Sequence, residues 1–171
     1  GYDSAGIVLF DGTDLKLSKT KGKVSDLELC AQNDKNTFGK VGMGHTRWAT
    51  HGVPNDVNSH PHFSNSGKLV IIHNGIIENY EPLKQELIKR GYTFQSDTDT
   101  EVLINLIEEV KKNENCKLGK AVQIALNQVV GAYAIAVIDL EKPDEIVAAR
   151  LGSPLAIGIG EDEFFIASDA T

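Results

Sequence analysis

Short apolar segments separated by polar turns open the chain and predict β-strands. Residues 4–10 (SAGIVLF) form an apolar run, an Asp-Gly pair follows, and apolar and polar residues then alternate over 15–18. Apolar segments on both sides of Asp-Gly are typical of a β-hairpin, because glycine tolerates the positive φ of a tight turn. Further strands are expected over 41–46 and 68–73. The second is an unbroken apolar run, which predicts a strand covered on both faces.

The middle of the chain carries the periodicity of amphipathic helices. Helices are predicted over four segments: 24–32, 79–90, 98–110 and 118–129. In the first, Val24, Leu27 and Cys30 share one face, so Cys30 is expected to point into the core as a small buried hydrophobe. The third begins with the sequence TDTE. This fits a capping box, with Thr98 as the N-cap and Glu101 reaching back to it.

The last third of the chain returns to strands. They are predicted over four segments: 131–140, 145–150, 154–159 and 163–168. The turns between them are too short for crossover connections, so neighbouring strands should be antiparallel. Strands, then helices, then strands again predict an α+β layered domain.

Length and composition narrow the possible classes of function. At 171 residues, with 41% hydrophobic residues, the chain suits one domain with a substantial core. The net charge of −7 argues against a nucleic-acid surface, and no apolar run approaches the ~20 residues that span a bilayer. Two cysteines, Cys30 and Cys116, imply no disulfide framework and favour the cytoplasm. Cys116 lies in a polar loop and is expected to be exposed.

Residues 44–75 concentrate the unusual chemistry of the chain. The segment contains all five histidines: His45, His51, His60, His62 and His73. It also contains the single tryptophan, Trp48, beside Arg47. Loops held by a rigid scaffold commonly carry binding and catalytic groups, so a functional site is expected here.

One interpretation of the histidines is a metal site. His60 and His62 would share one face of a strand, and a further histidine would complete the ligand set. However, no carboxylate or thiol stands at a familiar metal-binding spacing, and Pro61 disrupts a regular strand, so we expect neither a metal nor a cofactor. The alternative is that imidazoles hydrogen-bond the loop backbone and hold its shape, which we expect of His45 and His62.

A second interpretation is a site that recognises charged groups and an amide. Arg47 can hold a carboxylate through two hydrogen bonds, and Asp99 can receive an ammonium group. Asn74 and Gly75 offer a side-chain and a backbone N–H, the two donors that an oxyanion hole needs. Each residue also has an ordinary explanation: a surface arginine, a helix N-terminal charge, or an Asn-Gly turn.

Several long motifs carry a resemblance to a known family. They are GYDSAG, GHTRWATHG, NSHPH, HNGIIENYEPL, SDTDTEV, GSPLAIG and FIASDA. In this order they resemble the glutaminase domains, or class II glutamine amidotransferase domains, of the glutamine–fructose-6-phosphate aminotransferase (isomerising) family. The resemblance extends over nearly the whole chain, 1–171. It implies a four-layer αββα sandwich of the N-terminal nucleophile hydrolase type, with mostly antiparallel sheets.

The resemblance also implies a reaction. An N-terminal cysteine attacks the side-chain amide of L-glutamine, with its own α-amine as the base, and ammonia and a thioester follow. Ammonia then reaches a sugar isomerase domain of the same chain, where fructose 6-phosphate becomes glucosamine 6-phosphate. The full-length enzyme is expected to be a cytoplasmic homodimer.

Residue roles are implied by the same resemblance. Arg47 would bind the glutamine carboxylate and Asp99 its ammonium group. Asn74 and Gly75 would form the oxyanion hole. The loop that closes over glutamine would contain three residues, with a histidine nearby: Trp48, Thr50 and His51, and His60.

One departure from the family pattern concerns the nucleophile. Residue 1 is glycine, and neither Cys30 nor Cys116 combines a thiol with a free α-amine. We therefore expect a glutaminase domain without its nucleophile segment and without the sugar isomerase domains, and expect this chain to be inactive. Without a strand that the family supplies, it should also be poorly stable or self-associated. A noncatalytic glutamine-binding regulatory module remains the alternative.

Overall fold

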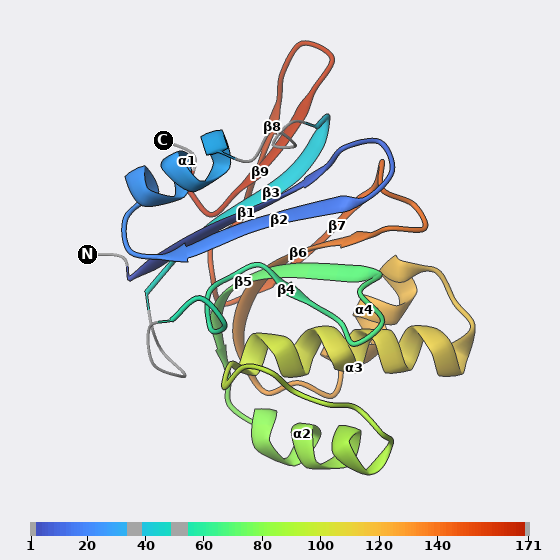
Figure 1. Ribbon diagram of the computed structural model, residues 1–171. Helices are drawn as coiled ribbons and strands as arrows, with labels where there is room; N and C mark the ends of the chain where they lie inside the picture. Colours follow the sequence, from blue (N-terminus) through green and yellow to red (C-terminus); the bar gives the residue numbers. More distant parts are fainter. Residues whose placement is uncertain (1–2, 34–38, 49–54, 170–171) are drawn as a thin grey trace.

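The structure, a computed structural model, describes residues 3–33, 39–48 and 55–169. Two β-sheets lie face to face and helices cover their outer sides, giving four layers in the order helix, sheet, sheet, helix (Figure 1). The architecture is therefore the expected α+β, αββα arrangement. No helix among the described residues is long and apolar enough to cross a bilayer.

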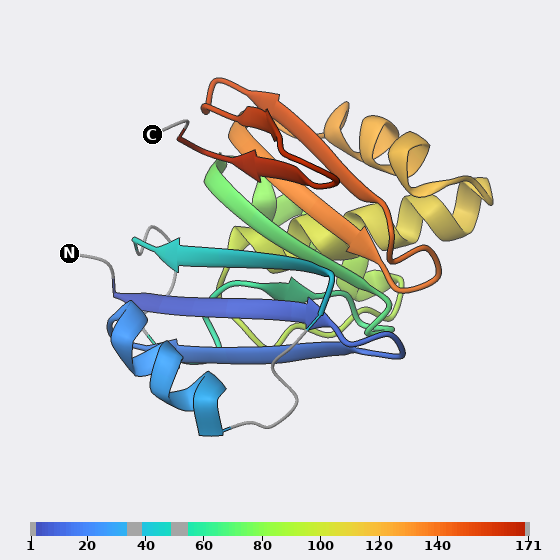
Figure 2. The same cartoon turned by 90° about the horizontal axis from the view of Figure 1, so that it is seen from above.

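All strand pairs within the sheets are antiparallel, as the short connections predicted. The first sheet has the order β2-β1-β3 and the second β4-β5-β6-β7, while β8 and β9 form a separate hairpin. Figure 2 shows β1 between its two neighbours. The strands are β1 (Ser4–Phe10), β2 (Leu15–Lys21), β3 (Val41–Arg47), β4 (His62–Phe63), β5 (Leu69–Ile77), β6 (Gly131–Asp139), β7 (Ile146–Leu151), β8 (Ala156–Ile159) and β9 (Phe164–Ala167).

The helices are unequally divided between the two outer layers. They are α1 (Val24–Asn33), α2 (Tyr80–Lys89), α3 (Asp99–Glu114) and α4 (Leu118–Leu126). The first covers the β1–β2 side of the first sheet, α3 and α4 cover the second sheet, and α2 packs against α3 (Figure 1). Only α3 is buried along most of its length, so it is the central helix of the thicker outer layer.

Two apolar clusters follow from the alternation of side chains along the strands. On β5, Leu69 and Ile71 face the helices and join the larger cluster, which includes residues of α3 and α4. Val70 faces the other way and packs between the sheets with Val8 and Met43. Further along β5 the same two faces carry the polar residues His73 and Asn74, and the candidate active site lies at that end of the strand.

The expected burial of Cys30 is wrong. Cys30 is exposed, and α1 has no buried residue. A helix on the outside of a three-stranded sheet buries only the side chains along its line of contact. Here Leu27 is half-buried, whereas Cys30 faces away from the sheet. The expected exposure of Cys116 is also wrong, because this side chain is half-buried against the larger apolar cluster.

The capping box at the start of α3 is half confirmed. Thr98 is the N-cap, and its hydroxyl accepts from the Glu101 N–H at 3.3 Å. The Glu101 carboxylate, however, does not return to Thr98. It accepts from the backbone N–H groups of Gln95 at 3.0 Å and Ser96 at 2.7 Å, and from the Ser96 hydroxyl at 2.6 Å. The segment before the helix folds over its first turn and offers these donors instead.

Candidate active site

A cavity of about 370 Å³ lies where the ends of β3, β5 and the first turn of α3 meet. Its volume is in the range of small-molecule sites, ~300–1,000 Å³. Six residues singled out in the sequence line this one cavity: Arg47, Trp48, His60, Asn74, Gly75 and Asp99. The structure thus brings together six residues that are spread over 52 positions of the chain, from 47 to 99. Thr50 and His51 lie outside the described residues.

The two charged residues of the cavity are both buried. Arg47 ends β3 with 3% of its surface exposed, and its Nη1 lies 3.7 Å from Asp3 Oδ1. Asp99 is also 3% exposed, and its Oδ2 accepts from the Ile77 N–H at 2.8 Å. Asp99 is the first residue of α3, where the helix dipole favours a negative charge. A buried cation and a buried anion therefore face one space.

Trp48 follows Arg47 and behaves differently. Its side chain is 70% exposed, which is unusual for a residue of this size. Since it also lines the cavity, the indole lies at the mouth.

Asn74 and Gly75 lie within β5, and the strand does not end in a turn at this point. It continues to Ile77, and Gly75 is paired with Tyr133 of β6. Gly75 has φ of +129°, and a Cβ there would stand 2.1 Å from the Ala132 carbonyl oxygen. Only glycine fits this conformation. An Asn-Gly pair usually marks a turn, but in this protein it produces a local distortion inside a strand.

Four of the histidines cluster at the cavity: His45, His60 and His73 line it, and His62 adjoins His60 without lining it. Nε2 of His60 and Nδ1 of His73 each lie 2.9 Å from the Thr100 hydroxyl, and Nε2 of His45 lies 2.7 Å from Asn74 Oδ1. The rings of His45 and His60 stack with centroids 4.3 Å apart. His62 meets His60 edge-on, with centroids 4.8 Å apart.

Burial keeps these imidazoles neutral. Loss of hydration lowers the pKa of His45, lowers that of His60 much further, and lowers that of His62 to about 3. Neighbouring positive charges act in the same direction on all three. The rings of His45, His60 and His62 are therefore neutral donors and acceptors at physiological pH.

The geometry argues against the metal interpretation for the described histidines. His60 and His62 bond to hydroxyls of α3, Thr100 and Thr98, at 2.9 and 3.2 Å. Among the described residues no group of three or more His, Cys, Asp or Glu side chains is arranged to hold a metal ion. His45 and His62 do hold the shape of the site, but through side-chain partners in α3 and β5 as well as through the backbone.

Two residues of the cavity, Thr100 and Ser168, were not predicted as site residues from the sequence. Thr100 links two imidazoles, and Ser168, just after β9, lines the cavity. Thr100 is the second residue of an amphipathic helix and is buried, and a buried hydroxyl indicates a polar partner. Ser168 belongs to the FIASDA motif, but the sequence does not show that it lines the cavity, because its place depends on the packing of the β8–β9 hairpin.

Comparison with known proteins decides the family. A family profile described as "Glutamine amidotransferase domain" matches residues 31–171. The chain belongs to the glutamine amidotransferase domain family. Over its full length, the chain is 60% identical to glutamine–fructose-6-phosphate aminotransferase (isomerising) of Bacteroides thetaiotaomicron. Over 99% of its length, it is 54% identical to the enzyme of the same name from Chlorobaculum tepidum. The chain spans 28% of each relative's length.

Solved structures place the amidotransferase domain in the same fold. The glutamine phosphoribosylpyrophosphate amidotransferase of B. subtilis, complexed with ADP and GMP, aligns with a TM-score of 0.79 and 32% identity, over 98% of this chain and 36% of that one. An "allosteric regulatory enzyme of purine biosynthesis" aligns with a TM-score of 0.81 and 34% identity over the same shares. These neighbours confirm the N-terminal nucleophile type of the fold.

Neither cysteine of this amidotransferase domain lines the cavity. Cys30 is exposed on α1, whereas Cys116 lines a different groove along the C-terminal half of α3. The two thiols are thus far from the atoms that the site presents.

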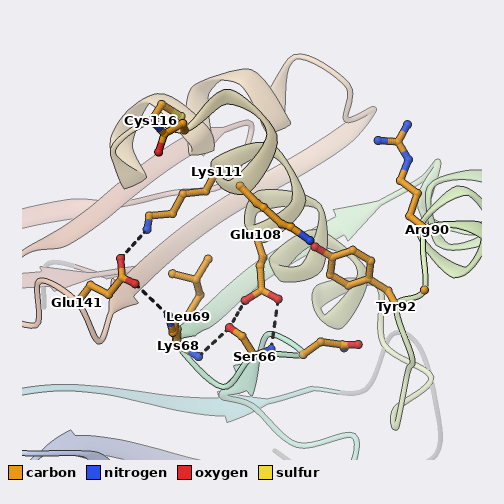
Figure 3. A pocket seen from close by; sticks show the side chains of 13 residues that line it. Ser66, Lys68, Leu69, Arg90, Tyr92, Glu108, Lys111, Cys116 and Glu141 are labelled. Carbon is orange, nitrogen blue, oxygen red and sulfur yellow. Dashed lines mark hydrogen bonds and ion pairs between the residues drawn. The ribbon is translucent and has the colours of Figure 1, made fainter.

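That groove is larger, about 610 Å³, but several of its charged side chains already bond to groups that line it (Figure 3). Glu141 lies between Lys68 and Lys111, at 3.1 and 3.0 Å. Glu108 accepts hydrogen bonds from Ser66. Because anion and cation neutralise each other at an open surface, the groove offers a ligand less than the buried, separated charges of the smaller cavity.

Proposed function

We propose that this chain is the glutaminase domain of a glutamine–fructose-6-phosphate aminotransferase. In the complete enzyme the domain releases ammonia from the side-chain amide of L-glutamine, and ammonia is used to convert fructose 6-phosphate to glucosamine 6-phosphate. Relatives at 60% and 54% identity carry that name. The observation that carries the proposal is the cavity, which combines a buried guanidinium, a buried carboxylate and an amide side chain.

Substrate capture is assigned to the two charged residues. A free α-amino acid carries a carboxylate and an ammonium group on one carbon. Arg47 binds the carboxylate through its planar guanidinium, and Asp99 accepts from the ammonium group. Trp48, together with Thr50 and His51, covers the bound glutamine. His60 supports the cavity wall.

The chemical step needs stabilisation of a negative oxygen. A thiolate attacks the amide carbon, the carbonyl oxygen becomes an oxyanion, and the side-chain N–H of Asn74 with the backbone N–H of Gly75 donates to it. Collapse of this intermediate breaks the C–N bond and leaves a thioester, and the nitrogen departs as ammonia with the proton that the α-amine of the cysteine took from its thiol. Water then hydrolyses the thioester to glutamate and regenerates the thiol.

The nucleophile of this reaction is neither Cys30 nor Cys116. We assign it to an N-terminal cysteine of the complete enzyme, as the family resemblance implies, so the 171-residue chain by itself should not hydrolyse glutamine. The complete enzyme also carries the sugar isomerase domain that receives ammonia, works as a homodimer, and resides in the cytoplasm.

Product formation by the complete enzyme tests the proposal. With L-glutamine and fructose 6-phosphate we expect equal amounts of glutamate and glucosamine 6-phosphate. Replacing both internal cysteines, Cys30→Ser with Cys116→Ser, should leave the rate within about twofold, since Cys30 is exposed, Cys116 is only half-buried, and neither lines the cavity. A protein that binds glutamine and forms neither product is a noncatalytic regulatory module, and the proposal then fails.

A further inference from the structure

One hydrogen bond connects the first sheet to the proposed oxyanion donor. His45 lies on β3 and Asn74 on β5, and their side chains meet between the sheets with His45 Nε2 2.7 Å from Asn74 Oδ1. Both residues also line the cavity. The contact lies next to the groups assigned to the reaction.

The direction of this bond is fixed by the acceptor. A carboxamide oxygen can only accept, so Nε2 of the neutral His45 ring carries the proton. Once Oδ1 is held by His45, the NH₂ group of Asn74 points to the opposite side. An asparagine without such a partner can turn its amide about χ2, a broad torsion, and present its oxygen instead. An oxygen at that position would repel the oxyanion.

The His45 ring is itself held in place. It stacks on His60 with centroids 4.3 Å apart, and Nε2 of His60 lies 2.9 Å from the Thr100 hydroxyl on α3. Burial lowers the pKa of His45, and bonds to the Asn74 side chain and the His73 backbone only partly oppose this. The ring therefore remains neutral and fixed while it donates.

We propose that His45 is a positioning residue for the glutaminase reaction, which orients the Asn74 amide so that its N–H faces the developing oxyanion. This rests on the proposed role of Asn74. His45 acts through Asn74 and not on glutamine, so its loss should lower kcat and leave KM nearly unchanged. A small misplacement of a reacting or stabilising group can cost ~10²-fold in rate.

The test is a double-mutant cycle in the complete enzyme, measured as glutamate release. His45→Phe keeps an aromatic ring to stack on His60 but removes the donor, and we expect kcat to fall about 10- to 100-fold. His45→Gln restores a side-chain N–H at similar reach and should recover most of that loss. The double variant His45→Phe with Asn74→Ala should be no slower than Asn74→Ala alone, because coupled residues are not additive.

Four outcomes decide between the explanations. Multiplicative losses in the double variant, or a rise in KM for His45→Phe, overturn the positioning role. Failure of His45→Gln to recover kcat, with an unchanged melting temperature, overturns it as well. If Asn74→Ala itself leaves kcat unchanged, the assigned oxyanion role is wrong, whatever His45 does. His62→Gln, which alters the same histidine cluster outside the cavity, controls for general loosening.

Discussion

At the scale of single residues, those assigned to glutamine binding and those assigned to the chemical step should affect different kinetic constants, KM and kcat respectively. In the complete enzyme, Asn74→Ala removes a donor used only in the transition state, so kcat should fall by ~10²–10³. Arg47→Ala removes a contact to a carboxylate that does not change during reaction, so it should mainly raise KM. Steady-state glutamate release measures both. A raised KM with normal kcat for Asn74→Ala would contradict the assignment.

Buried neutral histidines should make stability depend on pH. The native-state pKa of His62 is lowered to about 3, below the ~6.5 of an unfolded chain. As pH falls below about 6.5, the unfolded state takes up a proton that the folded state excludes, so stability decreases, by roughly 1 kcal/mol per pH unit per histidine. We expect the melting temperature to fall from pH 7.5 to 5, and His62→Gln to reduce that slope. An equal slope in the variant would count against this cause.

Residue identities in the site could be inferred from the sequence, but their partners could not. Arg47 and Asp99 were recognisable because each lies inside a motif that matches a family, GHTRWATHG and SDTDTEV. That Asp99 also accepts from Ile77, or that Thr100 joins two imidazoles, depends on how α3 approaches β5. Such contacts between distant segments leave no local pattern in the chain.

At the scale of elements, the distorted end of β5 is the most constrained position. Gly75→Ala combines a forbidden φ of +129° with a Cβ 2.1 Å from a backbone oxygen that cannot move aside easily. We expect a loss of more than ~4 kcal/mol in stability, or failure to fold. Gly67→Ala is the matched control. It has φ of +75° and nothing within 4 Å, so it should cost only about 1–2 kcal/mol. Urea unfolding of both variants provides the comparison, and equal losses would refute the steric explanation.

Helices and strands were predicted well where a hydrophobic pattern extended over many residues. They were predicted poorly where the prediction depended on one short feature. The stripe of α3 and the apolar run of β6 gave the right type and nearly the right ends. By contrast, the Asn-Gly pair pointed to a turn, yet β5 continues through it because β6 pairs with it to Ile77. Three apolar residues at helical spacing gave α1, but a helix at the edge of the domain buries little.

At the scale of the whole molecule, the isolated chain exposes more apolar surface than a stable monomer should. Ile159 and Phe164 face each other across the β8–β9 hairpin and are 81% and 77% exposed. A cavity of about 260 Å³ also opens between β3, β5, β6 and β9. We expect the 171-residue chain to self-associate, since such patches drive association. Sedimentation should show species larger than the monomer, and Ile159→Ser with Phe164→Ser should reduce them. A stable monomer at high concentration would contradict this.

Binding of L-glutamine to the 171-residue chain tests the proposed site most directly. Calorimetric titration into folded protein, checked by the near-ultraviolet signal of Trp48, should show saturable binding of L-glutamine and none of D-glutamine. Asp99→Asn keeps an oxygen for the Ile77 N–H but removes the charge assigned to the ammonium group, so binding should be lost while the fold persists. If folded protein binds no L-glutamine, or if Asp99→Asn binds it equally well, the cavity is not the glutamine site.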